Sequence, residues 1–169
     1  LWLGAEHIAI GIDHLFFVAG LLLLVGWSMR LVFTVTAFTV GHSVTLALVS
    51  LGVVTKPEAV IEWLIALSIW VLAFELSRPG KHSRLWQRPW YLAALFGLLH
   101  GMGFAGALAE TGLPQLHLPT ALLFFNVGIE LGQLAFIALL TVVGALVLRV
   151  SQASWIKIAP VYVLGAVST

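Results

Sequence analysis

The sequence contains no cysteine among its 169 residues. Disulfide bridges and thiolate metal sites are therefore excluded. The strong ligands that remain for a metal ion are imidazole, carboxylate, amide and backbone oxygen. Any metal site in this chain has to be built mainly from histidine, acidic and amide side chains.

Charged residues are scarce: they make up 9% of the chain, whereas hydrophobic residues make up 61%. A soluble domain carries about 25% charged residues, so this chain cannot cover itself with a hydrated surface. Its long apolar runs must be helical in lipid, because every backbone polar group has to be paired within its own segment. We predict an all-α, polytopic membrane helical bundle, formed by a single transmembrane domain over residues 1–169 with the lipid bilayer as its main partner. We expect no nucleic-acid partner.

The chain also lacks a recognisable start, because its first residues show neither a charged n-region nor a small-residue cleavage site. Its last apolar run, Ala159 to Thr169, ends without a flanking charge. We expect that the chain is trimmed at both ends, with an extracytoplasmic domain as a candidate for the missing upstream part.

Hydropathy and loop residues divide the chain into about six expected transmembrane helices. They run from about Gly4 to Trp27, Leu31 to Leu51, Glu58 to Leu76, Trp90 to Leu108, Pro119 to Leu148, and from Ile158 onward. Seven of the eight basic residues fall in loops on one side of these spans, and only Lys56 falls on the other. The basic side is predicted to be cytoplasmic, which places the N-terminus and Leu116 outside a bacterial inner membrane and Arg84 inside the cell.

Several ionisable side chains lie within the apolar spans. On a continuous helix His7 and His14 would share one face with Gly11 between them, while Asp13 would point about 100° away from His14. A charge or imidazole in hydrocarbon costs roughly 2.5–3.5 kcal/mol, so such groups normally face a partner, an ion or water. For any one histidine, a hydrogen bond to a serine or a carbonyl is the simpler explanation.

Four of these side chains, from four different spans, are expected at the same depth. At a rise of about 1.5 Å per residue they lie near the middle of a hydrocarbon core of about 30 Å. The four are His14, His42, His100 and Glu130, with His7 and Glu62 above them at the outer mouth. Convergence of four spans at one level favours a functional site over separate packing roles.

Two further patterns bear on how the spans pack. Asn126, Glu130 and Gln133 are spaced i, i+4 and i+7, so they share one stripe that we expect to face the bundle interior. Four glycines occur between Gly97 and Gly106, a density that lets neighbouring helix backbones approach closely.

Segments of four spans resemble the HupE/UreJ group of bacterial membrane proteins, and more closely its second subfamily. The matching segments are Gly11–Phe17, Phe38–Leu48, Phe96–Ala105 and Phe125–Leu134. The resemblance implies nickel or cobalt uptake for hydrogenase and urease maturation. It also implies a metal role for His7, Asp13 and His14, on which the family's His-x5-Asp-His signature falls. Nickel members carry a later pair of histidines, whereas this chain has His100 but Gly103 and Phe104 where the second is expected.

We predict a protein that binds a divalent transition metal ion (nickel, cobalt or zinc) near the midplane and moves it inward. The expected ligands are His7, Asp13, His14, His42, His100 and Glu130, and the expected supporting residues are Ser43, Asn126, Gln133 and Glu62. Neutral imidazoles suit such ions, and a carboxylate neutralises part of their charge.

Two other functions stay open. In an intramembrane zinc-type hydrolase, three histidines would hold the metal and a carboxylate would act as general base. The sequence lacks the His-Glu-x-x-His and Gly-x-Ser-x-Gly signatures of familiar hydrolases. A structural or sensing partner without an ion path would use the same polar residues for hydrogen bonds alone.

Overall fold

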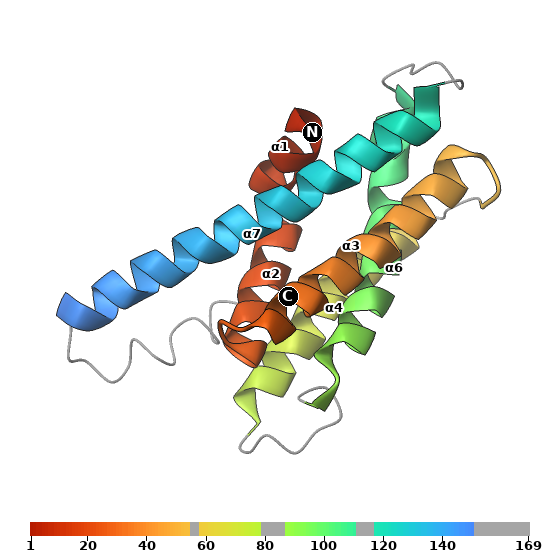
Figure 1. Cartoon of the computed structure of the whole chain (residues 1–169). Helices are drawn as coiled ribbons and strands as arrows, with labels where there is room; N and C mark the ends of the chain where they lie inside the picture. Colours follow the sequence, from red (N-terminus) through yellow and green to blue (C-terminus); the bar gives the residue numbers. More distant parts are fainter. Residues whose placement is uncertain (55–57, 79–86, 111–116, 151–169) are drawn as a thin grey trace.

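The computed structural model describes residues 1–54, 58–78, 87–110 and 117–150, and its elements are helices. They are α1 (Trp2–Ile10), α2 (Ile12–Val25), α3 (Met29–Ser50), α4 (Glu58–Ser77), α6 (Pro89–Glu110) and α7 (Leu118–Val150) (Figure 1). The predicted all-α architecture is confirmed. The expected locations of Arg84 and Leu116 and the span from Ile158 lie outside the described residues.

Three of the described helices are long and apolar enough to cross a membrane: Met29–Ser50, Ala59–Ser77 and Leu118–Val147. The bent pair α1 and α2 makes a fourth if it is counted as one span. The span expected from Trp90 to Leu108 is helix α6, which has 22 residues. Over its described residues α6 is not among the helices that are long and apolar enough to cross a membrane. The described part of the chain therefore holds three or four of the roughly six spans that we predicted.

Large apolar side chains cover the outside of these helices. Phe33 on α3, Trp63 on α4 and Leu139 on α7 are among those that are more than half exposed. A water-soluble monomer rarely exposes contiguous apolar surface of this extent. Together with the candidate spans, this surface identifies the chain as a membrane protein.

The first expected span is not a continuous helix. At Gly11 the backbone is extended (φ −73°, ψ 91°), and the axes of α1 and α2 differ by 82°. The Gly11 N–H still donates to the carbonyl of His7, and a Cβ at this position would meet that carbonyl and the His14 ring. The prediction of one unbroken helix is therefore wrong, and His7 and His14 belong to two helices that meet at a glycine.

The helix α7 is unbroken over 33 residues, and Figure 1 shows it lying diagonally across the bundle. At 1.5 Å per residue it is about 50 Å long, which exceeds a hydrocarbon core of about 30 Å. A helix of this length fits the bilayer when it is tilted.

Glycines allow α3 and α6 to pack with their backbones in contact. A Cβ on Gly97 would overlap the carbonyl of Phe38, and a Cβ on Gly101 would overlap the carbonyl of His42. Gly41 faces α6 in the same way, against the carbonyl of Ala94. Small residues at helix contacts permit this close approach in membranes. The expectation drawn from the glycine-rich fourth span is confirmed, and the contact places His42 and His100 on adjoining helices.

A second glycine contact fixes α1 on α7. Gly4 lies against the carbonyl of Phe125, and Gly128 lies against the carbonyl of Leu1. A Cβ on Gly132 would lie 3.2 Å from the Cα of Ala5, which is tighter than an ordinary contact. The short helix α1 is thereby held on the first half of α7, where the two helices run side by side (Figure 1).

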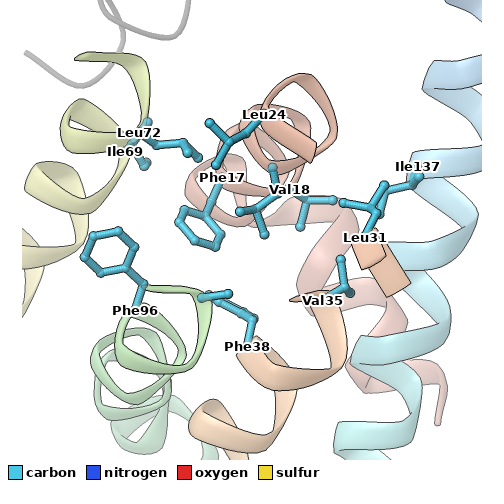
Figure 2. Close-up of a cluster of buried hydrophobic side chains, with 12 residues drawn as sticks. Phe17, Val18, Leu24, Leu31, Val35, Phe38, Ile69, Leu72, Phe96 and Ile137 are labelled. Carbon is cyan, nitrogen blue, oxygen red and sulfur yellow. The ribbon is translucent and has the colours of Figure 1, made fainter. Parts of the chain in front are cut away.

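A cluster of buried hydrophobic side chains joins α2, α3, α4, α6 and α7. Figure 2 shows its side chains pointing toward a shared interior: Phe17, Val18, Leu24, Leu31, Val35, Phe38, Ile69, Leu72, Phe96 and Ile137. Most of these are under 2% exposed. Close packing of this kind leaves the neighbouring polar side chains little freedom to move.

Candidate metal centre

Four histidines from four helices meet at the centre of the described bundle. His7 comes from α1, His14 from α2, His42 from α3 and His100 from α6. The His14 ring centroid lies 4.7 Å from that of His7 and 4.8 Å from that of His100. Ligand nitrogens of His7, His14 and His42 all lie within 4.8 Å of one another. We call these four residues the histidine group.

Each imidazole of the histidine group has one buried nitrogen without a hydrogen-bond partner. These atoms are Nε2 of His7, Nε2 of His14, Nε2 of His42 and Nδ1 of His100. Leaving a buried polar atom unpaired costs about 1–3 kcal/mol. Unpaired imidazole nitrogens on neighbouring rings are the kind of polar atom that a bound cation would pair.

Asn126 of α7 determines which nitrogen of His42 is available. The Asn126 side-chain nitrogen donates to the carbonyl of Leu122 at 2.8 Å, so its oxygen faces His42 Nδ1 at 3.3 Å. An amide oxygen only accepts, so Nδ1 must carry the hydrogen and Nε2 keeps its lone pair. Nε2 of His42 is one of the buried nitrogens without a hydrogen-bond partner.

The nitrogens of three histidines are near enough to approach the spacing of a metal-bound set. Zinc–nitrogen bonds of about 2.0–2.1 Å imply ligand atoms about 3.3 Å apart in a tetrahedral shell. The ligand nitrogens of His7, His14 and His42 lie within 4.8 Å of one another, so the set is up to about 1.5 Å wider than such a shell. Shifts of roughly 1 Å or less per side chain, by small χ rotations, would bring three nitrogens to bonding distance.

Aromatic rings enclose the histidine group. The Phe104 ring lies 3.9 Å from His7 and is stacked on Phe125 at 5.0 Å. Phe38 and Phe17 lie 5.2 Å and 5.6 Å from His100. An apolar enclosure of this kind strengthens interactions between an ion and its ligands, because it keeps water away.

The predicted stripe on α7 does face the bundle interior. Asn126 is 8% exposed and Gln133 is fully buried. Glu130 accepts hydrogen bonds from Thr36 (2.6 Å between Oγ1 and Oε1) and from Thr39. The Thr39 hydroxyl oxygen also lies 3.0 Å from Gln133 Oε1, and because it has one hydrogen it donates to either Glu130 or Gln133.

Glu130 and His100 both lie outside the compact set of ligand atoms formed by His7, His14 and His42, although the His100 ring lies 4.8 Å from that of His14. The Glu130 carboxylate is occupied by the two threonine hydroxyls of α3. The many threonines of the second span indicated buried polar contacts. The packing of α3 against α7 shows that Glu130 is the partner of Thr36 and Thr39.

Three other predicted residues lie apart from the histidine group. Asp13 is exposed in the first turn of α2, where a carboxylate interacts favourably with the helix dipole. Glu62 is exposed on α4. The Ser43 hydroxyl donates to the carbonyl of Thr39 at 2.7 Å, within its own helix.

Ser68 and Phe104 contact the histidine group, and neither was predicted to do so. Ser68 lies 3.2 Å from His100 Nε2, and Phe104 covers His7. A signal for Ser68 exists in the sequence, since it is the one hydroxyl-bearing residue between Trp63 and Leu76.

A family model described as HupE / UreJ protein matches residues 1–169, which is the entire chain. No curated protein and no solved structure shows detectable similarity to the chain.

Proposed function

Because the chain belongs to the HupE/UreJ family, we propose that it binds a divalent transition metal ion of the nickel or cobalt type and moves it inward across the membrane. The family is associated with nickel and cobalt transport. The ion is the cargo, and the histidine group is its binding site. Zinc is a further ion that the same ligands suit.

The observation that carries this proposal is the set of four unpartnered imidazole nitrogens. Imidazole binds nickel, cobalt, zinc and copper, whereas magnesium and calcium prefer oxygen ligands. With no cysteine in the chain, thiolate cannot compete for the ion. The donor set therefore favours borderline transition metals.

The order of the rings supports passage of the ion as well as binding. The His14 ring lies between those of His7 and His100, at 4.7 and 4.8 Å. An ion held by some of these nitrogens can be taken over by a neighbour through ligand exchange. Neutral ligands do not cancel the charge of the ion, so they bind it less permanently than a set of thiolates or carboxylates would.

Transport is favoured over hydrolysis by the composition of the site. Within the described residues, the compact set of ligand atoms consists of histidines, and no carboxylate belongs to it. Activation of a metal-bound water usually needs a nearby general base. Glu130, the predicted carboxylate, is bonded to Thr36 and Thr39 instead.

Uptake by reconstituted vesicles tests this function. Vesicles containing the protein should accumulate Ni²⁺ or Co²⁺, and His14→Ala should abolish the accumulation. His117→Ala is the matched control, because His117 is exposed and lies outside the histidine group. Equal uptake by the wild type and His14→Ala would contradict the proposal, and so would binding without any uptake.

A further inference from the structure

Ser68 is a buried hydroxyl on α4 that contacts the histidine group from outside. Its side chain is fully buried, and its oxygen lies 2.6 Å from the carbonyl of Ile65 and 3.2 Å from His100 Nε2. Ser68 lies on α4 and His100 lies on α6, so this contact joins the two helices. A hydroxyl among the apolar residues of α4 needs partners of this kind.

The number of hydrogens determines the direction of both bonds. A serine hydroxyl has one hydrogen and two lone pairs, and a carbonyl can only accept. The hydrogen therefore goes to the Ile65 carbonyl, because two oxygens at 2.6 Å without a hydrogen between them would repel each other. The lone pairs of Ser68 remain, so the contact with His100 requires a hydrogen on Nε2.

A neutral imidazole with its hydrogen on Nε2 has its lone pair on Nδ1. Nδ1 of His100 is the nitrogen that is buried without a hydrogen-bond partner. His42 has the opposite arrangement, because Asn126 holds its hydrogen on Nδ1 and leaves Nε2 open. The two rings are thus set in different tautomers by partners on two different helices.

We propose that Ser68 is a positioning residue, which fixes the Nε2–H tautomer of His100 so that His100 receives the metal ion through Nδ1. The proposal rests on the proposed function, since it concerns the same site. If the Ser68 hydroxyl is removed, the Nε2 hydrogen of His100 loses its acceptor. The ring can then exchange tautomers or rotate. Partners that orient a metal-binding histidine typically contribute 10- to 100-fold in affinity.

The first test observes the wild-type protein, with one variant for signal assignment, and needs no metal. Nitrogen NMR of protein with ¹⁵N-labelled histidine distinguishes the two tautomers, and His100→Gln identifies the His100 signals by their loss. The expected result is a hydrogen on Nε2 of His100 and on Nδ1 of His42. A hydrogen on Nδ1 of His100 would overturn the role of Ser68 and leave the proposed function intact.

The second test measures Co²⁺ affinity and the Co²⁺ absorption spectrum. Ser68→Ala should weaken binding by about 10- to 100-fold and change the spectrum, whereas Ser68→Thr, which keeps the hydroxyl, should restore both. Ser43→Ala is the matched control, because the Ser43 hydroxyl bonds a carbonyl of its own helix and no imidazole.

The outcomes of the second test separate the two proposals. Equal affinity in Ser68→Ala and wild type, or an equal loss in Ser43→Ala, would refute positioning by Ser68. If neither the wild type nor any variant binds Co²⁺, although the tautomers are as expected, the proposed function and the ligand role of His100 would both be overturned.

Discussion

Replacing Gly97 by alanine should separate the two helices that carry His42 and His100. The Cβ of residue 97 would lie closer than 3.0 Å to the Phe38 carbonyl and about 3.0 Å from the backbone nitrogen of His42. Both neighbours are backbone atoms of α3, so they cannot rotate away as a flexible side chain can. The helices α3 and α6 must therefore move apart.

The size of the effect follows from this overlap. Forcing an additional methyl group into a packed interface costs about 1–3 kcal/mol. Alanine favours a helix over glycine by up to about 1 kcal/mol, which offsets part of this cost. We expect a net destabilisation of roughly 1–2 kcal/mol, accompanied by weaker metal binding because the His42 and His100 rings separate.

Unfolding in mixed detergent micelles measures the free-energy change, and equilibrium binding of Co²⁺ measures the effect on the site. Gly144→Ala provides the control, since a Cβ at residue 144 of α7 would have no atom within 4 Å. The control should be neutral or slightly stabilising and should keep full affinity. If Gly97→Ala is no more destabilising than Gly144→Ala, the reasoning about the α3–α6 contact is refuted.

Three further predictions concern the site and the topology. Asn126→Leu should leave His42 Nδ1–H without its acceptor and lower Co²⁺ affinity by about 10- to 100-fold, as equilibrium titration would show; unchanged affinity would argue against this orientation. Metal bound per protein should decrease as pH is lowered, because a protonated imidazole cannot bind a metal ion, and a flat profile in equilibrium dialysis would point to oxygen ligands. In intact cells a membrane-impermeant thiol reagent should label Leu116→Cys but not Arg84→Cys, and the reverse pattern would invert the predicted topology.

The proximity of three histidines could be expected from the sequence because a helix has a fixed rise per residue. Counting from the ends of the spans predicted His14, His42 and His100 at one level, and in the structure the rings of His42 and His100 lie within 6 Å of the His14 ring. The stripe of Asn126 and Gln133 followed from helical periodicity in the same way. These are properties of single helices.

The remaining features depend on how the helices pack side by side, which periodicity does not specify. Glu130 was predicted at the depth of the histidines, but its partners are set by the contact of α7 with α3, which supplies Thr36 and Thr39. The break at Gly11 was hidden because a glycine within an apolar run is tolerated in a membrane helix. Ser68 needed α4 to be placed beside His100 before its role was visible.

Metal content of purified protein tests the central claim, that the histidine group binds one transition metal ion. The comparison is elemental analysis of the wild type with His14→Ala, His42→Ala and His100→Ala, restricted to variants that remain folded, with His117→Ala as control. The account predicts close to one nickel, cobalt or zinc ion in the wild type and control, and a loss of most of it in each of the three variants. Full metal content in all three variants would contradict the shared site and the function proposed for it.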